Sequence, residues 1–148
     1  MMAYVGYADI EERLGSANYI QLTDDTGAGN ADLDKVSEAQ LAAEGEVNSY
    51  LGRRYSVPID LANHSDLSGL LKSITLDLIE FRLHSRRPPI PSDIRYKREA
   101  ALTWLKGIAS GQWVLPSTKE VNANAASGIS GEAVGADRVM TSEELADL

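Results

Sequence analysis

The chain has 148 residues, no cysteine and a formal net charge of −8. Its composition is that of a globular protein, and the lack of cysteine excludes a disulfide framework, a thiol nucleophile and a cysteine-ligated metal. Because the sequence shows neither a signal peptide nor an apolar run of membrane-spanning length, we expect a soluble, unexported protein with no membrane partner.

The charge is unevenly spread along the chain. Residues 1–51 carry ten acidic and two basic side chains, residues 52–106 carry six and ten, and residues 107–148 carry six and two. The acidic total argues against nucleic acid as the main partner, because phosphate binding draws on clustered Lys and Arg. The acidic ends of one copy could attract the basic middle of another copy. Alternatively, all three regions are solvated charged faces, and both interpretations stay open.

The first predicted helix runs from residue 8 to residue 22. Asp9 suits its first turn, and Ile10 and Leu14 share one face. Gly15 interrupts the helix before a short continuation, and a loop rich in Asp, Gly and Asn follows.

A second helix is predicted over residues 32–53, where Leu33, Val36, Val47 and other apolar residues follow helical spacing. Gly45 in its middle costs about 1 kcal/mol relative to alanine, so we expect it to permit a close helix contact.

The third predicted helix, residues 66–85, has apolar residues on two nearly opposite sides. Leu76, Ile79 and Leu83 form the second of these two stripes. A helix on the outside of a small bundle needs only one. Because so short a chain has little material to bury both, we expect these three leucine and isoleucine side chains to form a subunit interface; an intrachain contact is the alternative.

Prolines at 88, 89 and 91 end this helix, and a fourth is predicted over residues 92–110. Ser92 is its expected N-cap and Gly111 its expected end. A short extended piece with Trp113 follows.

After residue 115 the composition changes to Ala, Gly, Ser and Asn, which cannot bury enough surface to fold alone. Thr141 and Glu144 have capping-box spacing, so a helical turn or two is expected at the end of the chain. We therefore divide the chain into an all-α helical domain, 1–115, and an extended C-terminal arm, 116–148. Trp113, Met140, Leu145 and Leu148 are its expected docking residues.

Candidates for chemistry are few. His64 and His84 lack neighbours at metal-ligand spacing, so a surface or capping role is the better interpretation. A calcium loop starting at Asp24 fails because Lys35 stands where the last ligand, a glutamate, is needed. We expect no enzyme activity, no metal and no cofactor; a hydrolase that uses Asp77 or His84 has little support.

Two charged features remain. Asp77 lies in the middle of the most apolar helix, and we expect it to form a structural ion pair with Arg98. A basic run clusters around the proline turn and comprises Arg82, Arg86, Arg87, Arg95, Lys97 and Arg98. It is either a DNA phosphate contact or a solvated turn paired with acids of the second helix, and the acidic total favours the second interpretation.

Several segments of the chain resemble the head-completion proteins of Mu-like phages and prophages. They are YADIEERLG (7–15), IQLTD (20–24), RYSVP (54–58), DLIEFRLH (77–84) and WLKGIASG (104–111), with Tyr50-Leu51 and Arg95-Tyr96 between them. These proteins are also called neck adaptors or head–tail connectors. The resemblance covers about residues 4–115.

The resemblance implies a structural virion protein with a connector-type bundle of about four helices. It implies a homo-oligomeric ring, twelvefold to match the portal, at the virion neck after assembly in the host cytoplasm. Expected partners are the portal protein and a tail-side neck or tail-terminator protein. Related connectors commonly reach the portal with a C-terminal arm, so Trp113, Met140, Leu145 and Leu148 are expected to dock on the portal or on a neighbouring copy. DNA would pass through the channel without specific binding, along a wall made acidic by residues 1–51. The alternative is a small helical DNA-binding or regulatory module that uses the basic turn.

Overall fold

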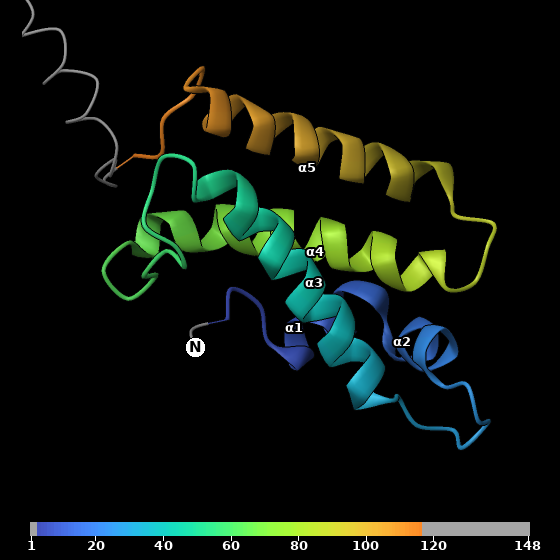
Figure 1. Ribbon diagram of the computed structural model, residues 1–148. Helices are drawn as coiled ribbons and strands as arrows, with labels where there is room; N and C mark the ends of the chain where they lie inside the picture. The colour runs from blue at the N-terminus through green and yellow to red at the C-terminus, as the bar shows by residue number, and fades with distance from the viewer. Residues whose placement is uncertain (1–2, 117–148) are drawn as a thin grey trace, which may run out of the picture.

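The structure is a computed structural model, and it describes residues 3–116. Within that range the chain is helical and has no strand, so the all-α prediction is confirmed (Figure 1). The helices are α1 (Tyr7–Leu14), α2 (Ser16–Thr23), α3 (Leu33–Leu51), α4 (Ser68–Ser85) and α5 (Ser92–Ser110), with a 3-10 turn, η1 (Ser65–Leu67), before α4. None of these helices combines the length and apolar content needed to cross a membrane.

Local signals place the helix ends. Gly15 separates α1 from α2 with a φ of 80°, and Gly111 ends α5 with a φ of 83°, a left-handed conformation that glycine adopts without strain. The Asp32 side chain caps α3 by accepting a hydrogen bond from an N–H of the first turn. Ser92 is the first residue of α5 and Pro91 precedes it, so the expected N-cap is one residue off.

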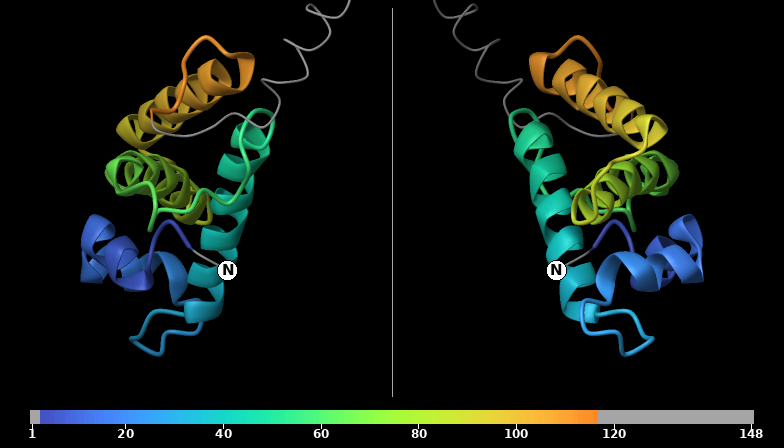
Figure 2. Two further views of the ribbon diagram at one scale, coloured as in Figure 1. Left: turned by 90° about the vertical axis from the view of Figure 1, so that its left-hand side faces the viewer. Right: turned by 90° about the vertical axis from the view of Figure 1, so that its right-hand side faces the viewer.

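The helices are arranged in three tiers with one helix across them. Figure 2 shows α5, α4 and the α1–α2 pair stacked in this order, with α3 running along the stack. Helix α3 contacts α5, α4 and α2, and α4 contacts every other helix. A single apolar core therefore extends through all three tiers, and α4 is its centre.

The central position of α4 overturns the predicted subunit interface. Leu76 is 6% exposed, and Ile79 and Leu83 are fully buried within the single chain. They belong to the same core cluster as Ile10 and Leu14 of α1. The subunit interface at Leu76, Ile79 and Leu83 was a wrong prediction, because the α1–α2 pair covers the stripe that we expected a second copy to cover.

Two ion pairs fix α1 along this side of α4. Lys72 Nζ lies 2.6 Å from Asp9 Oδ1, and Arg13 Nη1 lies 2.7 Å from Asp77 Oδ1. Asp9 and Arg13 are one turn apart on α1, and their partners are five residues apart on α4. An eight-residue helix is too short to be stable alone, so α1 depends on these contacts and on the core beneath them.

Segments outside the helices are also tied to the core. The Tyr4 hydroxyl donates to Asn48 Oδ1 at 2.6 Å and accepts from the Ile59 N–H at 2.9 Å. The buried Tyr55 hydroxyl accepts a hydrogen bond from the Leu115 N–H at 3.0 Å. The loop after α3 thus holds both the start and the end of the described chain.

Gly45 does not serve a close contact within the chain. It is exposed on α3, and a Cβ atom added there would meet nothing within 4 Å. The expected close helix contact at this glycine is therefore wrong for the described residues.

Candidate interaction surfaces

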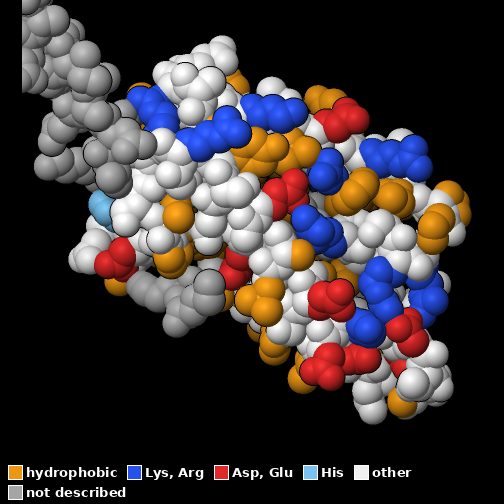
Figure 3. Space-filling view, viewed as in Figure 1, with side chains coloured by type: hydrophobic (Ala, Val, Ile, Leu, Met, Phe, Trp, Pro, Cys, Tyr) orange, Lys and Arg blue, Asp and Glu red, His pale blue; other side chains and the backbone are white. Residues whose placement is uncertain are grey.

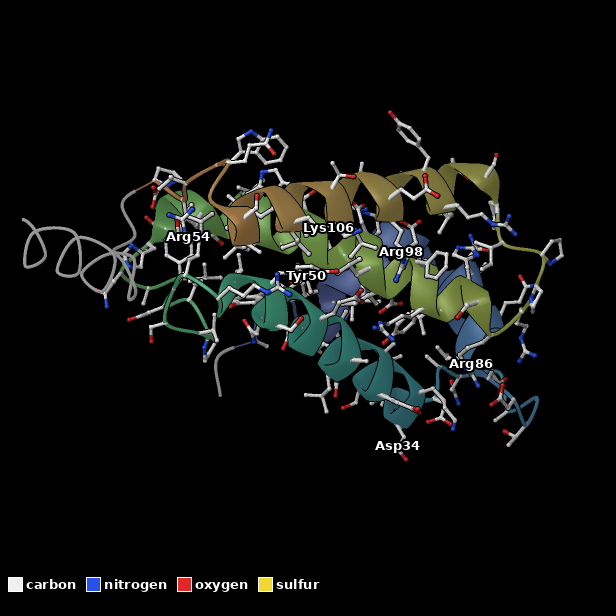
Figure 4. All side chains as sticks on the ribbon, turned by 45° about the horizontal axis from the view of Figure 1, so that its top comes forward. Asp34, Tyr50, Arg54, Arg86, Arg98 and Lys106 are labelled. Carbon is white, nitrogen blue, oxygen red and sulfur yellow. The ribbon has the colours of Figure 1, made fainter. Side chains whose placement is uncertain are left out.

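The basic turn between α4 and α5 is bound to the end of α2. Arg86 forms an ion pair with Asp25 at 2.5 Å and donates to the Leu22 carbonyl oxygen. Arg87 pairs with Asp25 at 2.9 Å and donates to the Gln21 carbonyl oxygen at 2.9 Å. Figure 4 shows Arg86 where the end of α4 meets the segment after α2. Both guanidinium groups therefore hold the fold together.

The next basic residues share Glu46 of α3. Arg82 lies 2.7 Å from one of its carboxylate oxygens, and Arg98 lies 3.4 Å from the other. The Arg98 guanidinium also lies over the Phe81 ring, 4.7 Å from its centroid, in a cation–π contact. The interpretation of this run as paired with acids of the second helix is thus confirmed for Arg82 and Arg98.

The predicted pair of Asp77 with Arg98 is wrong. Asp77 binds Arg13 of α1, and Arg98 is occupied by Glu46. The neighbouring Glu80 is 8% exposed and lies 3.6 Å from Arg13. The cause of the error is the one that misplaced the subunit interface: α1 packs against α4 and brings its own arginine to these carboxylates.

The Asp-rich loop after α2 organises itself around Asp24. Its Oδ1 accepts hydrogen bonds from the backbone N–H groups of Thr26, Gly27 and Ala28 at 3.0–3.2 Å. Its Oδ2 accepts from Gly29 at 2.8 Å. These hydrogen bonds, that from Gly29 first, lower the pKa of the Asp24 carboxyl below its ordinary value. In the described part of the chain no group of three or more His, Asp or Glu side chains could hold a metal ion.

The outward face of α5 carries an aromatic groove that the core does not use. Tyr96 is 74% exposed and Trp113 is 42% exposed. With half-buried Trp104 they line a surface hollow of about 480 Å³, completed by Glu99, Ala100 and Thr103. We call this surface the α5 groove. Half-exposed aromatic side chains with a polar atom are typical of interface centres.

Trp113 is held in the α5 groove by the end of its own helix. The backbone N–H of Trp113 donates to the Gly107 carbonyl oxygen at 3.2 Å. A Cβ atom added to Gly107 would lie 2.5 Å from the Trp113 ring, so only glycine allows the indole this position. Its predicted docking role stays a prediction. The other predicted docking residues, Met140, Leu145 and Leu148, lie outside the described residues.

A second exposed surface lies on α3. Leu41 is 56% exposed at the middle of the helix, next to exposed Ala42 and Gly45, and Leu33 is 52% exposed at its start. Sequence reasoning missed this face and the α5 groove. The sequence does contain a signal for the α5 groove, because Tyr96, Ala100 and Trp104 are spaced four residues apart beside the core stripe of α5.

The chain was compared with known proteins. A family model described as Bacteriophage Mu, Gp36 matches residues 4–132. The match runs 17 residues further than the resemblance found in the sequence, which ended at residue 115, so part of the C-terminal arm belongs to the family pattern. No curated protein matches the chain. The chain therefore belongs to the Bacteriophage Mu Gp36 family and is a phage structural or morphogenesis protein associated with the virion.

Proposed function

We propose that this protein is a non-enzymatic head–tail connector, which forms a ring beneath the portal, lets DNA pass and joins head to tail. The observation that carries the proposal is the family match over residues 4–132, most of the chain. The helical architecture agrees with the connector-type bundle implied by the resemblance. The division into a helical domain, 1–115, and an arm, 116–148, remains part of this proposal.

The state of the basic residues supports passage of DNA without binding. Arg82, Arg86, Arg87, Lys97 and Arg98 all have a carboxylate within 4.0 Å. Figure 3 shows acidic side chains interleaved with Lys and Arg over this part of the surface. Since paired guanidinium groups release few counterions from DNA, the basic turn makes a poor phosphate site. The acid excess of residues 1–51 fits a channel wall, which is our proposed orientation.

The ring contact must use surfaces that the single chain leaves exposed. In a ring each copy meets its neighbours through two different surfaces, because head-to-tail contacts close by rotation. The exposed α3 face and the α5 groove are two such surfaces on different helices of the molecule. We therefore transfer the ring contacts from the buried side of α4 to these two surfaces, each of which meets a different part of a neighbouring copy.

Deletion of the gene from an inducible prophage tests the proposal. Full heads and complete tails should accumulate without joining, and electron microscopy of the lysate should show both. Addition of the purified protein should restore joining, and native mass spectrometry with the portal protein should show a cyclic assembly. Normal particles in the deletion strain would refute the connector role.

The rival function, a DNA-binding or regulatory module, makes a different prediction. Filter binding over a salt series should show tight association with a steep salt dependence if the basic turn contacts phosphates. We expect weak binding, because only Arg95 of the predicted basic run lacks an ion pair among residues 3–116.

A further inference from the structure

The α5 groove has the properties of a surface built to receive a short apolar segment. Its aromatic residues come from α5 and from the segment that follows it. Trp113 is fixed there by Gly107 and by the Tyr55–Leu115 hydrogen bond, so the hollow is preformed. A preformed aromatic hollow loses little conformational entropy on binding, which favours a small occupant.

Two cationic side chains flank the α5 groove beside Glu99, which lines it. Arg95 and Lys106 are exposed on the Glu99 side of α5, and neither forms an ion pair among the described residues, in contrast to the paired arginines of the basic turn. Figure 3 shows Lys and Arg side chains following α5, and Figure 4 shows Lys106 on this helix. An occupant should therefore combine apolar side chains with carboxylates.

The end of this chain has that chemistry. Residues 139–148, VMTSEELADL, contain three acidic side chains and no basic one. With Thr141 as N-cap and Glu144 three residues later, Met140 and Leu145 take the two positions of a hydrophobic staple, and Leu148 follows on the same side. A helix this short would be unable to bury its own apolar side, so it would need a surface elsewhere.

The connecting segment, residues 117–138, sets how far this end reaches. Its 22 residues are rich in Gly, Ala, Ser and Asn, and a chain of that length would have a root-mean-square span of about 26 Å if it behaved as a random coil. The helical domain is roughly 35 Å across by the relation between chain length and radius of gyration. A span of that size is of the same order as the distance to an adjacent subunit, so a tethered contact with a neighbour is within reach.

We propose that residues 139–148 of one copy occupy the α5 groove of an adjacent copy. Met140, Leu145 and Leu148 pack against the aromatic side chains, while Glu143 and Glu144 face Arg95 and Lys106. This inference rests on the proposed function only in that the connector ring places two copies side by side. The arm then links the subunits: each copy binds the α5 groove of one neighbour and receives the arm of another neighbour in its own α5 groove.

Disulfide trapping tests the proposal cleanly, because the chain has no native cysteine. A tagged full-length chain with Ala100→Cys is mixed with an untagged one with Leu145→Cys, at high concentration and again in purified particles. A disulfide forms only where the two Cβ atoms approach within about 4.5 Å. Mixed dimers should exceed those of a Glu12→Cys control, placed on distant α1, by about tenfold or more.

Charge reversal sharpens the same measurement. Arg95→Glu on the tagged chain should lower the yield of mixed dimer, and Glu144→Arg on the untagged chain should restore it. A yield no higher than that of the control would overturn the proposal. An intrachain disulfide formed alone, in a chain that carries both Ala100→Cys and Leu145→Cys, would also overturn it. So would a disulfide between Ala100→Cys and Leu41→Cys, which would place α3 of the neighbour in the groove.

The two proposals fail separately. Mixed dimers together with normal particles from the deletion strain would refute the connector role and leave the arm contact standing. Unjoined heads in that strain, without mixed dimers, would refute the arm contact and leave the connector role standing.

Discussion

Helices α4 and α5 are of similar length and each carries apolar residues beyond one stripe, yet only α5 keeps the extra ones exposed. On α4 the second stripe is buried beneath α1, with Ile79 and Leu83 fully covered. On α5, Tyr96 is 74% exposed. The charged neighbours differ in the same way: Lys72 and Asp77 beside the α4 stripe are paired with α1, whereas Arg95 and Lys106 on α5 have no ion pair in residues 3–116.

This difference shows how a core stripe can be distinguished from an interface stripe. Apolar side chains alone do not separate the two, because both bury the same kind of surface. The flanking charges do, since a helix that packs within its own chain brings partners for them. Apolar residues beside unpartnered cations therefore indicate a surface meant for another molecule.

The largest expected effect is on α4. Ile79→Asp should unfold the domain or destabilise it by several kcal/mol, because it places a carboxylate where no water reaches. Tyr96→Asp on α5 should change the free energy of unfolding by no more than about 0.5 kcal/mol, since that side chain is exposed. Urea unfolding followed by circular dichroism measures both. A stable Ile79→Asp variant would mean that α4 is not central.

The next effect concerns the pairing of α1 with α4. Arg13→Ala removes the guanidinium from both Asp77 and Glu80, and leaving these largely buried carboxylates without it should cost about 1–3 kcal/mol. Lys72→Ala is the matched control, because its exposed pair with Asp9 is worth less than about 1 kcal/mol. Equal losses in the two variants would contradict the distinction between these ion pairs.

The sequence predicts a feature of this structure well when the residues that determine the feature lie close together along the chain. Gly15, Gly111 and the prolines after α4 act locally, so the helix positions were predicted correctly. The partner of Asp77 is 64 residues away, on a helix whose apolar signal is only Ile10 and Leu14. No periodicity within α4 reveals which element covers its second stripe, and both the subunit interface and the Arg98 pair were misassigned for that reason.

Gly45→Ala extends the comparison to the exposed face of α3. An added methyl group meets no atom within 4 Å, so the variant should gain about 0.5–1 kcal/mol of stability from the better helix former. Thermal unfolding measures the gain. A variant that is more stable but joins heads to tails less well would show that a neighbouring copy approaches α3 closely at this glycine, whereas unchanged joining would leave the α5 groove as the tighter contact.

The smallest effect is a pH dependence of the α1 contact. The hydrogen bond from Lys72 is the main cause that lowers the pKa of Asp9, and the Gly6 N–H adds to it. A depressed carboxyl pKa stabilises the folded state above the ordinary aspartate value of 3.8, and this contribution is lost as the pH falls through the lower, folded value. The protection of the α1 amides against hydrogen exchange should therefore fall below pH 3.8 before that of the α5 amides does, and Asp9→Asn should remove that difference. If α5 loosened first, the ion pair with Lys72 would not be what keeps α1 over the buried side of α4.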